Sequence, residues 1–110
     1  MKLIRSVIRP DKVDAVKCAL RAANVLALTV AEVRDHAPDN RHERVWRGHV
    51  YIRDDLARFE MSVVVHDEDA DDVVAAIVRV ARTTQRADGY VTVLPVEHRY
   101  NIHTGQREVV

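Results

Sequence analysis

Six histidines, three tyrosines and one cysteine are the residues of this 110-residue chain that most readily carry chemistry. His42 and His49 lie in one polar segment, but their spacing matches no zinc-binding pattern, and they could meet only if that segment folded back. No Ser-His-Asp or Cys-His arrangement stands out, and no pair of carboxylates has an obvious catalytic role. The residues therefore predict neither a catalytic site nor a metal site.

The remaining reactive residues have simple structural interpretations. Cys18 lies beside the buried stripe of a predicted helix, which favours a role as a small apolar packing residue. The acidic run 67–72 suits the solvated start of a helix, where the helix dipole favours negative charge. A single cysteine cannot form an internal disulfide, and no signal peptide is visible, so we expect a reduced, cytoplasmic protein.

Composition narrows the class of protein. Hydrophobic residues make up 47% of the chain, charged residues 31%, and the net charge is zero, which is typical of a single globular domain, expected over residues 1–110. The longest wholly apolar run, Val73 to Val78, is far shorter than the about 20 residues of a membrane span. Zero net charge gives no electrostatic reason to expect nucleic acid as a partner.

Hydrophobic periodicity predicts four strands and two helices. In order, the expected elements are a strand at 2–9, a helix from Pro10–Asp11 to about Ala23, a strand at 26–34, a strand at 58–65, a helix from the acidic run to about Thr83, and a strand at 90–94. Phe59, Met61, Val63 and Val65 should share one face of their strand. Asp88-Gly89 is the strongest turn signal in the chain.

This order predicts an α+β fold of the ferredoxin-like βαββαβ type, with an antiparallel sheet and two helices on one face. The first two strands carry apolar residues on both faces, so we expect the face without helices to be buried against other copies of the chain. A structureless loop of about 20 residues is uncommon in a compact domain. Either the elements assigned around the polar segment 35–57 are wrong, or this segment has a function of its own.

Five segments, taken together and in order, resemble the family of PII signal transduction proteins, the trimeric nitrogen and carbon sensors also called nitrogen regulatory protein P-II. The segments are Met1 to Pro10, Trp46-Arg47-Gly48-His49-Val50-Tyr51, Val80 through Asp88-Gly89, Leu94-Pro95-Val96-Glu97 and Thr104-Gly105. The resemblance covers nearly the whole chain. It implies a homotrimer, a projecting loop between the second and third strands (the T-loop, about residues 36–57), and adenine nucleotides bound in clefts between subunits.

The resemblance also implies two groups of site residues. The nucleotide-binding group is Thr29, Val64, Thr83, Arg86, Ala87, Asp88, Gly89, Asn101 and His103, and the effector or T-loop group is Asp39, Arg47, Tyr51 and Arg58. The implied ligands are ADP, AMP or ATP, with magnesium as a further candidate. Tyr51 resembles the family's nucleotidylation site, but its neighbours His49 and Val50 differ from the small and acidic residues usual there; the alternative is an exposed tyrosine that contacts a partner.

Several positions depart from the family pattern. Asp39 replaces the glutamine that helps to hold magnesium and 2-oxoglutarate, and its charge would repel a dicarboxylate. Arg58 replaces a lysine and could still pair with a carboxylate. Among the phosphate ligands, Ala87 replaces a glycine, and Tyr90, Asn101 and His103 replace three cations. Losing charge-assisted contacts at roughly 1.5–3 kcal/mol each should weaken triphosphate binding, unless the backbone amides of 86–89, Arg86 or Arg99 compensate.

The expected function is that of a signalling protein, not an enzyme, which senses an adenine nucleotide and regulates a partner through the T-loop. A membrane transporter or a metabolic enzyme is the kind of partner expected. The first alternative is a divergent sensor of a smaller ligand, such as AMP, a cyclic nucleotide or bicarbonate, linked to a transporter or to carbon assimilation. The others are a ferredoxin-like small enzyme and a metal-tolerance protein of similar trimeric shape.

Overall fold

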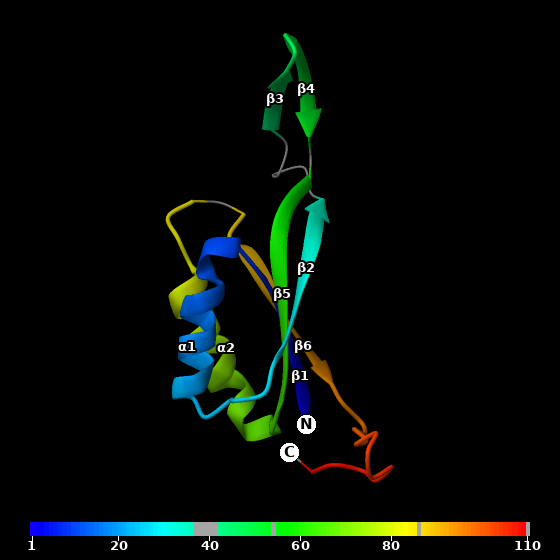
Figure 1. The fold of residues 1–110 in the computed structure, drawn as a ribbon. Helices are drawn as coiled ribbons and strands as arrows, with labels where there is room; N and C mark the ends of the chain where they lie inside the picture. The colour runs from blue at the N-terminus through cyan, green and yellow to red at the C-terminus, as the bar shows by residue number, and fades with distance from the viewer. Residues whose placement is uncertain (37–41, 54, 86, 110) are drawn as a thin grey trace.

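The chain forms one four-stranded antiparallel sheet with two helices on one face and a separate hairpin beyond one end (Figure 1). The computed structural model describes residues 1–36, 42–53, 55–85 and 87–109. The sheet has the order β2-β5-β1-β6, and its strands are β1 (Lys2–Ile8), β2 (Thr29–His36), β5 (Asp55–Val65) and β6 (Gly89–Pro95). The helices are α1 (Val13–Ala22) and α2 (Ala70–Ala81). The predicted βαββαβ order and antiparallel sheet are confirmed.

Both helices begin with a short 3₁₀ turn at the positions that the sequence predicts. The turn Pro10–Lys12 leads into α1, with proline at the start, where its missing N–H costs nothing. The turn Asp67–Asp69 leads into α2 and places the acidic run at the positive end of the helix. No helix in the described part of the chain is both long enough and apolar enough to cross a membrane.

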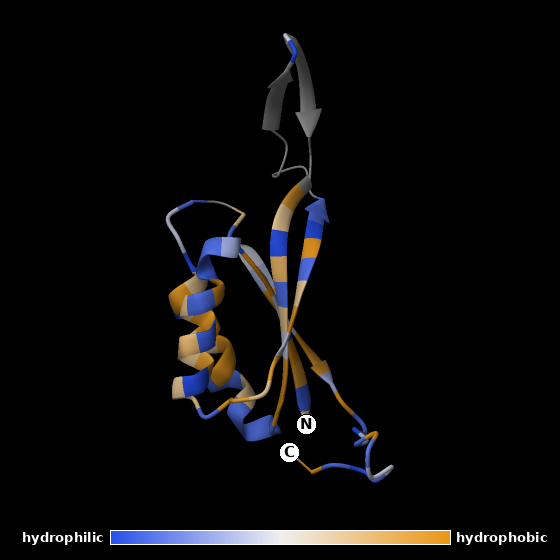
Figure 2. Cartoon of the chain, viewed as in Figure 1, coloured by the Kyte–Doolittle hydropathy of each residue, from blue (hydrophilic) through white to orange (hydrophobic). Residues whose placement is uncertain are grey.

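The hydrophobic core lies between the two helices and the sheet. Figure 2 shows hydrophobic and hydrophilic residues alternating along β2 and β5, as one-sided burial requires. Met61, Val63 and Val65 are buried on β5, and partly buried Phe59 packs against the same cluster, so the predicted face is confirmed. The other buried members are Ile4, Ile8, Val16, Leu20, Ala70, Val73, Ile77 and Ala81.

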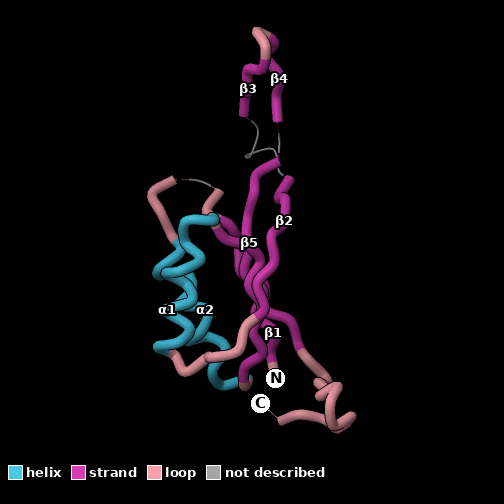
Figure 3. Tube along the Cα trace, in the orientation of Figure 1, coloured by secondary structure: helices cyan, strands magenta, loops and turns pink. Residues whose placement is uncertain are grey.

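The strand register assigns the alternate residues to the opposite face of the sheet. Leu3 pairs with Val64 and Leu94, and Val7 pairs with Glu60 and Tyr90, on the side away from α1 and α2 (Figure 3). Apolar residues thus lie on both faces of β1, as the sequence predicts.

The segment predicted as a long loop does lie between the second and third strands of the sheet, but it contains regular structure that the sequence did not predict. The strands β3 (His42–Trp46) and β4 (His49–Arg53) form a hairpin within it, and β5 begins at Asp55 instead of Arg58. Arg47 and Gly48 connect β3 to β4 with positive φ angles of 51° and 78°, the signature of a two-residue turn that matches strand twist. The strand-forming residues on either side of this turn explain the pairing.

Two smaller expectations also differ from the structure. Strand β2 starts at Thr29 instead of Leu26, and Leu26 is 78% exposed in the connection after α1. Asn24 in that connection has a φ of 64°, so the chain changes direction there before it can enter the sheet. Cys18 is exposed, not packed, because the buried face of α1 is formed by Val16, Ala19 and Leu20.

Candidate functional site

The turn from Thr83 to Gly89, between α2 and β6, is held by the carboxylate of Asp88. Asp88 Oδ2 accepts a 2.8 Å hydrogen bond from the backbone N–H of Thr83, and Oδ1 accepts one from the Thr83 hydroxyl. The Thr83 hydroxyl in turn accepts a 3.1 Å bond from the N–H of Gln85. Arg9, which follows β1, donates from Nε to Asp88 Oδ1 at 3.0 Å. This network preforms the turn.

The same network fixes the charge of Asp88. Hydrogen bonds from the side chain and the backbone of Thr83, followed by the bond from Arg9, lower the pKa of Asp88 from 3.8 to about 2. Asp88 is therefore anionic at neutral pH. A negative charge repels phosphate, so this residue shapes the turn and is poorly suited to bind a phosphate directly.

The backbone at the end of the turn passes unusually close to β1. Gly89 has a φ of 114°, and a Cβ atom at this position would lie 1.8 Å from the carbonyl oxygen of Val7. Only glycine fits such an approach. Ala87 has a φ of 59°, a left-handed conformation that glycine adopts more easily than alanine. The departure of Ala87 from the family glycine therefore leaves the backbone shape in place.

Arg58 links this turn to the start of β5. Its side chain is only 5% exposed, and it donates from Nη2 to the carbonyl oxygen of Ala87 at 2.9 Å and from Nη1 to that of Ala57 at 3.1 Å. Its buried Nε has no hydrogen-bond partner within the described part of the chain. Burial, and then the charge of Arg9, lower the pKa of the Arg58 guanidinium.

A cavity of about 320 Å³ lies beside the turn, between α2 and the edge strand β6. Its walls are mostly apolar and come from Val7 and Ile8 of β1 and from residues of α2, while Arg82, Asp88 and Tyr90 supply polar groups. Tyr90 is 54% exposed. This combination can receive a flat apolar group next to the turn.

Thr29 and Val64 lie in a different part of the sheet. They line a cavity of about 170 Å³ together with Leu3, Ser62 and Arg99. The guanidinium of Arg99 pairs with Glu108, with 3.0 Å between Nε and Oε2. Arg99 could therefore replace a missing phosphate-binding cation at this cavity only while its guanidinium also pairs with Glu108.

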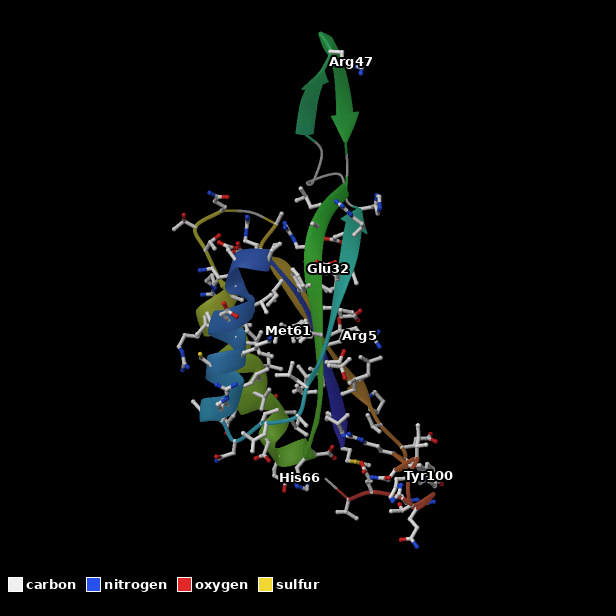
Figure 4. The ribbon with its side chains drawn as sticks, viewed as in Figure 1. Arg5, Glu32, Arg47, Met61, His66 and Tyr100 are labelled. Carbon is white, nitrogen blue, oxygen red and sulfur yellow. The ribbon has the colours of Figure 1, made fainter. Side chains whose placement is uncertain are left out.

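Asn101 and His103 lie in the tail that follows β6. The Asn101 side chain donates to Glu108 at 2.9 Å, and its oxygen accepts from the backbone N–H groups of His103 at 2.8 Å and Thr104 at 3.2 Å. The amide of Asn101 is thus used to shape the tail, whereas His103 is exposed. Tyr100, labelled in Figure 4, marks the position of this tail at the opposite end of the sheet from the hairpin.

A single chain does not bring all the predicted residues together. Thr83, Ala87, Asp88 and Gly89 meet Arg58 at one end of β6. Asn101 and His103 follow its other end, roughly 20 Å away for a seven-residue strand. Arg47 lies at the exposed turn of the hairpin and Tyr51 in β4, opposite Arg44. Arg86 and Asp39 lie outside the described residues.

The hairpin separates the two histidines of the polar segment. His42 is opposite Arg53 and His49 is opposite Trp46, so the two lie at opposite ends of the hairpin, although the segment does fold back. Within the described ranges, no three His, Cys, Asp or Glu side chains gather as metal ligands would. Sequence reasoning missed one residue of the turn network, Arg9. The signal that could have indicated its contact with Asp88 was a basic residue directly after the first strand.

Comparison with known proteins identifies close relatives of the whole chain. The family model described as "Nitrogen regulatory protein P-II" matches residues 1–106. A protein of that name from Cereibacter sphaeroides is 39% identical over 106 residues, which cover 96% of this chain and 95% of the relative. Its counterpart from Microchaete diplosiphon is 36% identical over 107 residues, covering 97% and 96%. A third, from Rhodobacter capsulatus, is 36% identical over 106 residues.

Proposed function

The chain belongs to the nitrogen regulatory protein P-II family, and on that premise we propose that it is a cytoplasmic homotrimer that senses an adenine nucleotide between its subunits. The family consists of signalling proteins, so the ferredoxin-like enzyme considered above is set aside. In this proposal residues 1–110 act as one domain. The T-loop, about residues 36–57, reports the ligand state to a regulated protein such as a membrane transporter or a metabolic enzyme.

The observation that carries the proposal is the hydrogen bond from Arg58 to Ala87. One end of this bond lies in the turn that would hold the phosphates, and the other lies in β5, directly after the hairpin strands β3 and β4. A ligand that moves the turn must therefore change the partners of Arg58. Arg58 is buried, so its hydrogen bonds cannot be replaced by water without cost.

Signalling then follows from differential affinity. If the ligand binds one arrangement of Arg58 and the turn better than another, the population of T-loop conformations shifts by the difference in binding free energy. Ligand and regulated protein would influence each other's affinity by the same factor. The Thr83–Asp88–Arg9 network keeps the turn rigid enough for such a shift to be transmitted.

The pocket favours a ligand with few phosphates. Asn101 occupies the place of a family arginine, and its amide is engaged within the tail. The carboxylate of Asp88 engages the guanidinium of Arg9, so that cation is already shared within the protein. Both features penalise ATP more than ADP or AMP, because a triphosphate carries more charge and more oxygens that need partners. AMP, a cyclic nucleotide or bicarbonate is therefore the preferred second candidate as effector.

Calorimetric titration of the full chain tests the proposal. Titration with ATP, ADP, AMP, a cyclic nucleotide and bicarbonate, each with and without magnesium and 2-oxoglutarate, should show binding of an adenine nucleotide and little preference for ATP. Tyr90→Lys restores one family cation at an exposed position and should raise ATP affinity about ten-fold or more.

Ala15→Lys is the control for this titration. It introduces the same charge at an exposed position of α1, away from both the turn and the tail. It should leave the affinity for ATP nearly unchanged. Absence of binding by every adenine nucleotide would refute the proposal. Tight ATP binding by the unaltered chain would contradict the preference for few phosphates and would indicate a sensor of ATP and 2-oxoglutarate.

A further inference from the structure

We infer that Arg5 and Glu60 select the orientation in which copies of this chain meet through the sheet face that the helices leave open. The inference rests on the homotrimer of the proposed function and adds the residues that decide which copies fit together. Figure 4 labels Met61 on the helix side of the sheet and Arg5 on the other side, where such an interface would form.

The two side chains form an ion pair across neighbouring strands. Arg5 Nε lies 2.7 Å from Glu60 Oε1, and the two residues are diagonal neighbours, because Arg5 is opposite Ser62 and Glu60 is opposite Val7. The Arg5 side chain is 45% exposed and that of Glu60 is 29% exposed. Both groups therefore keep accessible surface that a second copy could contact.

The neighbours of the pair suit burial. One row across the sheet consists of Leu3, Val64 and Leu94, and the row that contains Glu60 also holds Val7 and Tyr90. The row of Arg5 carries the small hydroxyl residues Ser62 and Thr92. Arg58 shares this face at the start of β5, but its guanidinium turns to the Ala87 carbonyl. Arg5 and Glu60 thus stand in a mixed apolar and hydroxyl surface.

Charge complementarity identifies a second copy as the occupant. Each copy offers one guanidinium, with five donors in all, and one carboxylate, with room for a second donor. In a closed ring, Arg5 of one copy can meet Glu60 of the next, so that opposite charges alternate around the axis. A buried pair adds little net stability, but an arrangement that brings like charges of two copies together is strongly disfavoured. The pair would therefore act mainly on specificity.

The decisive experiment uses a charge-swapped chain, Arg5→Glu with Glu60→Arg. This variant restores an ion pair within each copy, so it should fold and assemble with itself. When it is mixed with the unaltered chain, every mixed contact brings either two glutamates or two arginines together. Mixed oligomers, counted by native mass spectrometry after tagging one partner, should fall at least about ten-fold below the statistical share.

A swap at exposed helical positions, Arg21→Glu with Glu68→Arg, is the control and should co-assemble freely. The single variants add a second measurement: each should assemble poorly, because Arg5→Glu puts two carboxylates and Glu60→Arg puts two guanidinium groups on every copy. Statistical mixing of the charge-swapped chain would overturn the inference while leaving the proposed trimer intact. If the unaltered chain is a monomer, the trimer itself fails and the inference fails with it.

Discussion

The guanidinium of Arg58 donates a 2.9 Å hydrogen bond to the carbonyl oxygen of Ala87, which lies 29 residues later in the chain. This bond joins the start of β5 to the turn before β6, two segments that share no strand pairing at this point. The carbonyl belongs to a residue with positive φ, so the bond also stabilises an unfavourable backbone conformation.

Arg58→Lys should loosen the turn. A lysine ammonium lacks the planar fork with which arginine reaches two carbonyls, so the bond to Ala87 or the bond to Ala57 must be lost. Amide hydrogen exchange in residues 83–89 should accelerate, and stability should fall by about 1.5–3 kcal/mol. Arg79→Lys, on the exposed side of α2, is the control. Equal exchange rates in the two variants would contradict the role of Arg58.

Ala87→Gly should stabilise the protein. The left-handed φ of Ala87 costs an L-residue roughly 1–2 kcal/mol of folding free energy, and glycine avoids this cost. Part of the resulting gain in stability is offset, because glycine has more conformational freedom in the unfolded chain. We expect a net gain of about 0.5–1 kcal/mol in urea unfolding. The same change in the interior of a helix, Ala75→Gly in α2, should instead destabilise by a similar amount. A loss of stability in both variants would show that Ala87 is unstrained.

Gly89→Ala and Gly105→Ala form a matched pair, which separates the cost of a steric clash from the cost of a positive φ. Both glycines have positive φ, but an added Cβ would lie 1.8 Å from Val7 O at position 89 and would meet nothing within 4 Å at position 105. Gly105→Ala should cost about 1–2 kcal/mol. Gly89→Ala should cost at least about 2 kcal/mol more, because β1 and β6 must separate. Equal midpoints in chemical unfolding would argue against the close approach of the two strands.

Asp88 should make stability depend on pH in the acid range. Its pKa in the folded protein is lowered to about 2, below its ordinary value of 3.8, so the unfolded chain takes up the proton first. The stabilisation is present above about pH 4 and is lost as the pH falls towards 2. Asp88→Asn should therefore be less stable than the unaltered chain at pH 7, and the difference should shrink between pH 4 and pH 2.

The same assignment can be checked without unfolding. Thr83→Val removes the hydroxyl that contributes most to the lowered pKa of Asp88, so the carboxyl resonance of Asp88 should titrate at a higher pH in this variant. If the titration curve of Asp88 is the same in Thr83→Val, the Thr83 hydroxyl is not what lowers the pKa of Asp88.

The core elements could be predicted because their patterns are strong. Met61, Val63 and Val65 alternate as a half-buried strand must, and Ile77 follows Val73 at helical spacing. The hairpin was missed because charged residues dominate segment 35–57, although Arg47-Gly48 between strand-forming residues was an available turn signal. Cys18 was misplaced because its position is one step away from the buried stripe of α1.

The candidate site could be predicted only in part. The polar turn that ends at Asp88-Gly89 was predicted from its residues. The hydrogen bonds of Asp88 were not, because they depend on Thr83 and Arg9 lying within reach. The engagement of Asn101 with Glu108 also depends on how the tail folds, since seven residues separate them. Such partnerships arise from tertiary structure and leave no pattern in the sequence.

The turn between α2 and β6 has one further consequence, which concerns how this protein can evolve. Its two ends are anchored by Thr83 with Asp88 and by the approach of Gly89 to Val7, and these anchors serve the sheet itself. The exposed positions between them, Thr84 and Gln85, bury little surface. Mutations at such positions cost little stability. If the turn holds the ligand, as proposed above, ligand preference can therefore change from one phosphate compound to another while the fold stays unchanged.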